Sequence, residues 1–255
     1  MEILYRRNTV LEALRGSRRQ LHRLWLQQGL PEQQAQPLLR AAQERGVPYA
    51  YAPKSKLGNL AQDSSHQGVV LEAGPYLYSS VDAILAEAAA RGEQPFLLLL
   101  DLLHGPQNIG SLLRTAEICG VHGVIIQDRR APDITPTVVI YSAGAAEHLH
   151  VSQVTNLVDT MRRLKEEEVW LVGMDLSEEA QLLGQIDLNM SIGIVVGHEG
   201  QGMRRLVRET CDFLLQLPMR GRVESFNAAI AGSILIFEAW QARGFVGAAG
   251  NDSAS

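Results

Sequence analysis

The sequence of 255 residues is poor in cysteine and contains no long apolar run. Its two cysteines, Cys119 and Cys211, form no CxxC pair, which suits buried, unpaired thiols in a reducing cytoplasm. No apolar segment approaches the ~20 residues that a membrane-spanning helix needs. The N-terminal residues also lack the apolar centre of a secretory signal. We therefore expect a cytoplasmic globular protein without a membrane segment.

Several catalytic signatures are missing as well. The seven histidines show no HExxH spacing and have no cysteine partners, so we expect no metal site. No G-x-S-x-G sequence occurs, which argues against a Ser-His-Asp hydrolase. The glycines at 197–202 follow neither the G-x-G-x-x-G nor the Walker pattern, so a standard dinucleotide or triphosphate site is not expected.

Charge is unevenly distributed along the chain. The net charge is -5, but residues 1–75 carry ten Lys or Arg against six Asp or Glu, and the remainder carries thirteen against twenty-two. A basic N-terminal part beside an acidic larger part indicates an anionic partner for the first part. Chance asymmetry is the alternative reading of the charge alone.

Apolar periodicity predicts two α/β domains. In residues 1–75 we expect helices at 8–16 and 33–46 and strands at 21–28, 47–52 and 66–73. Residues 76–95 form a linker with a helix-prone middle, and 246–255 form a disordered tail. In 96–245 we expect strands at 96–101, 123–127, 169–174, 192–197 and 213–218, and helices at 109–120, 155–167, 203–211 and 227–243. Nearly continuous apolar strands between helices predict a parallel sheet covered on both faces.

The stretch after the first of these strands, DLLHGPQNIGSLLRTAE, carries two residues that could serve chemistry. Asn108 occupies a position typical of a helix N-cap, and capping alone would explain it. Arg114 lies off the apolar face of the predicted helix, one turn after Gly110, so a ligand could approach there. An ordinary solvated arginine is the alternative.

Two further segments follow strands in the same way. Glycines 197, 200 and 202 follow an apolar strand, which lets backbone N–H groups approach a ligand closely. Ser225 and Asn227 precede the last helix, where capping would also explain them. That helix is apolar almost all round, so it must be buried in a core or a subunit interface. Loops at the carboxyl ends of parallel strands cluster at one sheet edge, where open α/β sheets bind ligands.

Taken together, the three segments resemble the three motifs of the SpoU (TrmH) family of RNA 2'-O-ribose methyltransferases. The matching residues are Asn108-x-Gly110-x-x-x-Arg114, Gly197-x-Glu199-Gly200-x-Gly202, and Leu217-Pro218-Met219-x-Gly221 with Ser225-x-Asn227. HQGVVLEA, SAGAAEHLHV, VTNLVDTMRRL and GMRRLVRETCD are similar to the RlmB branch, which methylates a guanosine ribose in large-subunit (23S) ribosomal RNA. The chain departs from the family at Gly105, Phe226 and Ala228-Ala229.

The resemblance implies a trefoil-knotted (SPOUT) parallel-sheet α/β methyltransferase domain, preceded by a small L30e-like α/β RNA-binding domain. It implies a homodimer formed through the knot and the last helix, and S-adenosylmethionine as the cofactor. The implied cofactor contacts are Gly197, Gly202, Leu217, Met219 and Phe226. The implied catalytic group is Arg114, with Asn108, Glu199, Ser225 and Asn227 around it.

An arginine is a poor general base because its pKa exceeds ~12. We therefore expect Arg114 to bind the ribose 2'-hydroxyl and stabilise the developing alkoxide. Phosphate contacts are expected from the basic N-terminal domain, through Arg6, Arg7, Arg18, Arg19, Arg23 and Arg40. Two alternatives remain open: a transfer-RNA methyltransferase with the same chemistry, and a non-catalytic RNA-binding ribosome-assembly factor.

Overall fold

The structure, a computed structural model, describes residues 1–129 and 133–248. They form two compact units, Met1–Leu77 with Ile134–His148, and Tyr78–Asp133 with Leu149–Ser255. The first unit thus takes in a short segment from the middle of the chain. Over the described residues, no helix combines the length and apolarity that crossing a membrane requires.

The first unit is built on a four-stranded mixed sheet in the order β1-β4-β2-β3. Strands β1 and β2 run antiparallel to β4, and β3 runs parallel to β2. The strands are β1 (Glu2–Tyr5), β2 (Leu21–Gln27), β3 (Tyr49–Ala52) and β4 (Val69–Ala73). The helices are α1 (Arg7–Arg15), α2 (Glu32–Glu44), α3 (Lys54–Ala61), α6 (Pro136–Tyr141) and the 3-10 turn η1 (Ala145–Glu147). The sequence predicted β2, β3, β4, α1 and α2 but not β1, α3 or α6.

A buried ion pair ties the segment Ile134–His148 to the N-terminal residues of this unit. Arg19 is 4% exposed, and its Nε lies 2.6 Å from Glu147 Oε1. Its guanidinium also contacts Glu2 and donates to the carbonyls of Gly74 and Ile134. Burial raises the pKa of the Glu147 carboxyl, and the nearby guanidinium opposes that rise. The prediction that Arg19 contacts RNA is therefore wrong, because its cation is enclosed and already paired.

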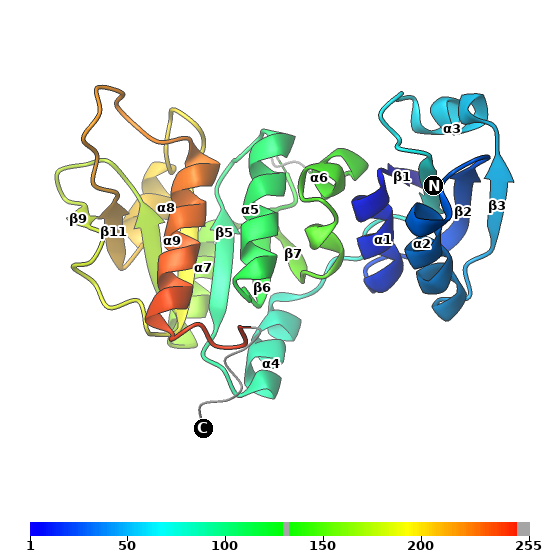
Figure 1. The fold of residues 1–255 in the computed structure, drawn as a ribbon. Coiled ribbons are helices and arrows are strands. Elements are labelled where there is room, and N and C mark those ends of the chain that lie inside the picture. Colours follow the sequence, from blue (N-terminus) through cyan, green and yellow to red (C-terminus); the bar gives the residue numbers. More distant parts are fainter. Residues whose placement is uncertain (130–132, 249–255) are drawn as a thin grey trace. The chain divides into compact units, whose positions relative to one another are not determined.

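The second unit is a seven-stranded sheet in the order β7-β6-β5-β10-β8-β11-β9 (Figure 1). Every neighbouring pair is parallel, as the apolar strand pattern predicted. The strands are β5 (Phe96–Leu100), β6 (Gly123–Gln127), β7 (Val151–Val154), β8 (Trp170–Met174), β9 (Gln181–Leu182), β10 (Ile192–Val196) and β11 (Phe213–Gln216). Strands β7 and β9 were not predicted.

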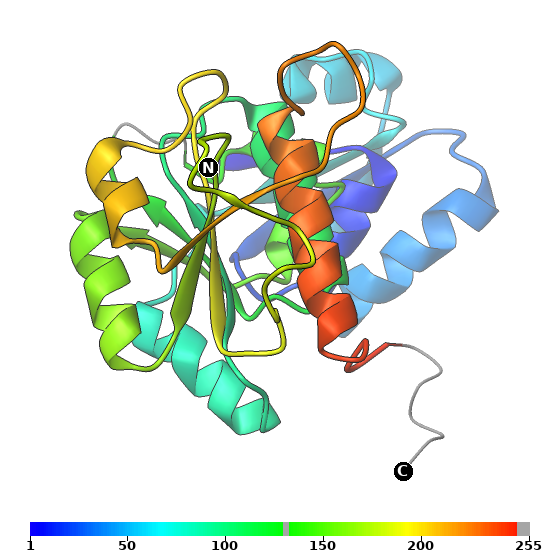
Figure 2. The ribbon, with the colours of Figure 1, turned by 90° about the vertical axis from the view of Figure 1, so that its left-hand side faces the viewer.

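Helices cover both faces of this sheet, as Figure 2 shows edge-on. They are α4 (Val81–Arg91), α5 (Pro106–Ile118), α7 (Leu157–Glu166), α8 (Arg205–Thr210) and α9 (Ala228–Ala242). Residues of α4, α7 and α8 share one apolar cluster with alternate residues of β5, β8 and β10. On the opposite face α5 packs along α9, where Thr115 Oγ1 lies 3.0 Å from Ser233 Oγ. The loops at the carboxyl ends of β5, β10 and β11 consequently share one edge.

Two other predictions meet the structure in this unit. Both cysteines are unpaired, and burial raises the pKa of Cys119 to about 11 and that of Cys211 to about 12, so neither thiol is a nucleophile at neutral pH. The predicted disordered tail 246–255 lies outside the described residues from 249 onward. In its described part, the Val246 carbonyl accepts a hydrogen bond of 2.9 Å from Trp240 Nε1.

Candidate active site

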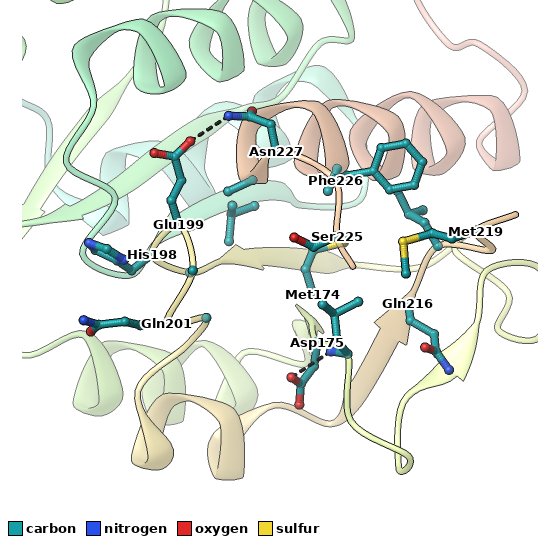
Figure 3. Close-up of a pocket in the computed structure, with 18 residues that line it drawn as sticks. Met174, Asp175, His198, Glu199, Gln201, Gln216, Met219, Ser225, Phe226 and Asn227 are labelled. Carbon is teal, nitrogen blue, oxygen red and sulfur yellow. Dashed lines mark hydrogen bonds between the residues drawn. The ribbon is translucent and has the colours of Figure 1, made fainter. Parts of the chain in front are cut away.

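Three polar side chains from three separate loops meet at the carboxyl edge of the large sheet. Glu199 Oε1 accepts hydrogen bonds from Asn108 Nδ2 and Asn227 Nδ2, each at 2.6 Å. Asn227 Nδ2 also lies 3.1 Å from Asn108 Oδ1. Figure 3 shows Glu199 pointing toward Asn227 at the start of α9. All three were predicted site residues, and the structure brings them into direct contact.

The two asparagines reach this cluster in different ways. Asn227 is the N-cap of α9, because its Oδ1 accepts from the N–H groups of Ala229 and Ile230 at 2.9 and 3.2 Å. Its amide nitrogen is then free to point at Glu199. The predicted capping role of Asn108 is wrong. Helix α5 begins earlier, at Pro106 with Gly105 as its cap, because proline fits the first helical position without needing a hydrogen-bonded N–H.

Glycine at position 105 keeps the approach to Asn108 open. A Cβ added there would lie 2.9 Å from Asn108 Nδ2, so a larger side chain would press on the amide that binds Glu199. The departure from the family pattern at this position therefore lies beside the three-residue cluster.

The glycine loop after β10 depends on close backbone packing. A Cβ on Gly197 would lie 2.4 Å from the carbonyl carbon of Gly202 and 2.5 Å from the nitrogen of Met203. His198 and Gly202 exchange two backbone hydrogen bonds of 3.0 and 2.9 Å. Gly202 adopts a φ of +68°, a left-handed conformation that favours glycine. Only a residue without a side chain fits at 197.

Asp101 is a residue of this edge that the sequence analysis did not single out. It is fully buried, and its carboxylate accepts from the backbone N–H of Arg204 at 2.8 Å and from the Arg204 Nε at 2.7 Å. It thereby ties the end of the glycine loop to the end of β5. An acid directly after five buried apolar residues was the available signal, because a buried carboxylate needs a partner.

The loops enclose a cavity of about 470 Å³ between the ends of β8, β10 and β11. All five predicted cofactor contacts line it: Gly197, Gly202, Leu217, Met219 and Phe226. Glu199, Ser225 and Asn227 line it too, as do Met174, Asp175 and Leu176 at the end of β8. Figure 3 shows Met219 and Phe226 on one side of the cavity and Glu199 on the other. The residues after β8 were not predicted, because no glycine or motif marks them.

Arg114 is the predicted site residue that this cavity does not include. It is exposed on α5, two turns after the helix start, and it lines neither the cavity nor the groove between α5 and α9. Asn108 lines that groove, whose other residues include Ile230 and Phe237 of α9. One chain alone therefore does not bring Arg114 to the cavity.

The predicted RNA contacts other than Arg19 lie at the surface of the first unit. Arg6 Nη2 donates to Ser65 Oγ at 3.3 Å, and the Arg23 guanidinium lies 5.3 Å from the Trp25 ring centre. Arg7 and Arg18 are half-buried, whereas Arg23 and Arg40 are exposed. Within residues 1–129 and 133–248, no cluster of three or more His, Cys, Asp or Glu is arranged to hold a metal ion.

Comparison with known proteins agrees with this geometry. Residues 95–237 match the SpoU rRNA Methylase family, and residues 3–79 match the RNA 2'-O ribose methyltransferase substrate binding family. The chain is 42% identical over 241 residues to YacO of Bacillus subtilis, named for the TrmH family of tRNA/rRNA methyltransferases, which covers 94% of this chain and 96% of that protein.

Solved structures show the same fold. The SpoU methyltransferase AviRb of Streptomyces viridochromogenes, in complex with AdoMet, superposes with a TM-score of 0.76 at 23% identity, over 94% of this chain and 90% of that one. An AdoMet-bound rRNA methyltransferase of Sinorhizobium meliloti gives a TM-score of 0.75 at 20% identity, over 94% and 87%. From the match over residues 95–237 and the relationship to YacO, the chain belongs to the SpoU family of RNA methyltransferases.

Proposed function

We propose that the protein transfers the methyl group of S-adenosylmethionine to the 2'-hydroxyl of a guanosine ribose in 23S ribosomal RNA. The observation that carries the proposal is the shared edge, where the Asn108-Glu199-Asn227 cluster adjoins the cavity lined by all five predicted cofactor contacts. The related structures from Streptomyces and Sinorhizobium contain AdoMet. The family's substrate-binding match in the first unit supports RNA as the acceptor.

The residues around the cavity suit this cofactor. Gly197 has no Cβ to obstruct the floor, and the side chains of Leu217, Met219 and Phe226 offer apolar surface for a nucleoside. When bound, S-adenosylmethionine supplies an electrophilic methyl group on a sulfonium. The protein's own task is then to hold the ribose hydroxyl in line and to favour its deprotonated form. A trefoil knot around this cavity stays part of the proposal.

Within this reaction the Asn108-Glu199-Asn227 cluster acts as a brace. Glu199 uses one oxygen to bind both asparagines, and Asn227 also fixes the start of α9. The cluster therefore holds the first, second and third loops at fixed separations beside the reacting groups. Ser225 lines the cavity one residue before Phe226 and would orient the ribose.

Arg114 would reach the ribose from a second copy of the chain. The groove between α5 and α9 exposes Ile230 by 54% and Phe237 by 45%, which is apolar surface suited to a homodimer through the last helix. Arg114 lies on the neighbouring exposed side of α5, without an ion pair. A partner's Arg114 would bind the hydroxyl and its neighbouring phosphate and stabilise the alkoxide, whichever group accepts the proton.

The test compares ribose methylation of 23S ribosomal RNA by the unaltered protein with that by Arg114→Ala and Arg114→Lys. We expect both variants to lose at least about 10²-fold in methyl transfer, the cost typical of removing one charge-stabilising donor. Binding of S-adenosylmethionine, followed by calorimetry, should persist because Arg114 does not line the cavity. Near-normal turnover by Arg114→Lys would overturn the assignment.

Transfer RNA is the second candidate substrate, because YacO is named for activity on tRNA or rRNA. Parallel assays on purified transfer RNA and ribosomal RNA separate the two. Arg6, Arg7, Arg18 and Arg23 remain proposed phosphate contacts in either case. A protein that binds no S-adenosylmethionine would instead be a non-catalytic RNA-binding factor acting in ribosome assembly.

A further inference from the structure

The loop between β11 and α9, residues 217–227, carries charge that the proposed cofactor site does not use. Its residues 218–227 are all exposed, and Figures 1 and 2 show it arching beyond the end of the sheet. Met219, Ser225 and Phe226 line the cavity, whereas Arg220 and Arg222 do not. The two arginines therefore stand at the rim of the site and not inside it.

Most cations of the second unit are neutralised by neighbouring acids. The pairs are Arg91–Glu87, Arg162–Asp159, Arg163–Asp82, Lys165–Asp212, Arg204–Asp101, Arg205–Glu209 and Arg208 with Asp175 and Glu179. Arg243 instead donates to the backbone carbonyls of Gln94, Pro95 and Met190. Among the described residues of this unit, Arg114, Arg129, Arg220 and Arg222 are left without an acidic partner.

Unpaired arginines in an acidic unit are available to bind an anion. The part of the chain after residue 75 carries thirteen Lys or Arg and twenty-two Asp or Glu, so free cations at one place stand out from their surroundings. Gly221 separates the two arginines, and a Cβ built on it would meet no atom within 4 Å, so the loop is open to a polymer passing across it. The one acid nearby, Glu224, is exposed and also without an ion-pair partner.

We propose that Arg220 and Arg222 grip backbone phosphates of the RNA strand on either side of the nucleotide presented to the cavity. This inference rests on the proposed function, since it takes RNA as the substrate of the neighbouring site. Guanidinium groups bind phosphate with two parallel N–H donors, and such contacts fix the register of a strand without reading its sequence. Glu224 repels the same phosphates and limits the strength of the grip.

The test is equilibrium binding of a short oligouridylate and of a 23S ribosomal RNA transcript over a series of salt concentrations. The variant is Arg220→Gln/Arg222→Gln, and the matched control is Arg91→Gln/Arg162→Gln, which also removes two exposed arginine charges but from other helices. We expect the loop variant to bind RNA about tenfold more weakly and to lower the salt slope by about 1.4, or about 0.7 for each phosphate released by a single strand. The control should leave the slope unchanged.

A change of opposite sign adds a second check. Glu224→Gln should tighten RNA binding, because it removes the only acid that faces the same strand. Calorimetry with S-adenosylmethionine should give unchanged affinity for the loop variant, since neither arginine lines the cavity. Equal salt slopes for the loop variant and the unaltered protein would overturn the inference, as would an equal loss in the control.

The outcome also separates this inference from the proposed function. If the unaltered protein methylates no ribose yet shows the loop-dependent salt slope, the proposed function fails and the phosphate grip stands. If it methylates RNA and the loop variant binds like the unaltered protein, the function stands and the grip fails. Absence of any RNA binding overturns both.

Discussion

Asn227 performs two jobs with the two ends of one amide group. Its oxygen caps α9, and its nitrogen binds Glu199. Asn227→Asp keeps the capping oxygen but replaces the donor with a second acceptor against Glu199, so we expect near-normal stability and loss of methyl transfer. Asn227→Ala removes both contacts and should also lower the free energy of unfolding by about 1 kcal/mol. Denaturant unfolding and methylation assays distinguish these results, and activity in Asn227→Asp would contradict the brace.

His122 gives the fold a dependence on pH. Its ring is buried; Nδ1 accepts from the Phe96 N–H at 3.0 Å and Nε2 lies 3.2 Å from Glu93 Oε2. Burial lowers the pKa of His122 below its usual 6.5, an effect that outweighs the nearby Glu93. A proton on Nδ1 would also break the bond to Phe96.

The unfolded chain therefore binds a proton at a pH where the folded protein does not, and stability falls as the pH drops below 6.5. His122→Asn, whose amide oxygen can accept from Phe96, should flatten this decline between pH 7 and about 5, measured as free energy of unfolding. An unchanged pH profile in His122→Asn would assign the decline to other groups.

At the residue scale, the sequence predicted the polar members of the site better than their local roles. Asn227 caps a helix as expected, but Asn108 does not, because Pro106 starts α5 two residues earlier. Arg19 was expected at the surface and is enclosed. Its partner Glu147 is 128 positions away, and no local pattern links two such residues.

At the element scale, the glycine loop after β10 depends on one close approach of two backbone segments. Gly197→Ala places a Cβ against the backbone of Gly202 and Met203, which cannot rotate away. We expect it to cut S-adenosylmethionine affinity at least tenfold and to lower stability by about 1–3 kcal/mol. Gly58→Ala in α3, where an added Cβ meets no atom within 4 Å, is the control and should gain about 0.5–1 kcal/mol. Calorimetry and thermal unfolding measure both, and normal cofactor binding by Gly197→Ala would show that the loop can relax.

The elements that sequence patterns predicted are those with strong apolar signals. Strands β5, β6 and β10 are buried at every position, and their continuous apolar runs are hard to miss. Strands β1 and β7 have only four residues each and include polar side chains, so their pairing with β4 and β6 decides their conformation. Helix α6 has six residues, too few to show a helical period.

At the scale of the whole molecule, the sequence order of the two units is not their structural order. Residues Ile134–His148 lie between two strands of the large sheet yet fold with the first unit. Close packing holds them there, since a Cβ on Gly16 would meet the Glu147 carbonyl oxygen at 2.4 Å and one on Gly144 would meet Glu12 Cβ at 2.6 Å. The segment therefore belongs to the RNA-binding part of the protein by structure, although the methyltransferase motifs flank it in sequence.

The position of Arg114 leads to a prediction about the assembled protein. If its guanidinium serves the cavity of a second copy, then Arg114→Ala and Gly197→Ala damage different halves of each site. Each variant alone should be inactive. After dissociation and reassociation as a mixture, mixed dimers would contain one complete site, built from Gly197 of one chain and Arg114 of the other. Random pairing makes about half of the dimers mixed, so about a quarter of normal methyl transfer should return.

The same experiment excludes the alternative arrangement. If Arg114 serves the cavity of its own chain, the mixed dimer has no complete site and activity stays at zero. Ile230→Asp in both chains is the control, because a charge on the apolar α5–α9 groove should prevent pairing and block any recovery. Recovery that depends on Ile230 would place the catalytic arginine across the subunit interface, since only pairing through this groove could then complete a site.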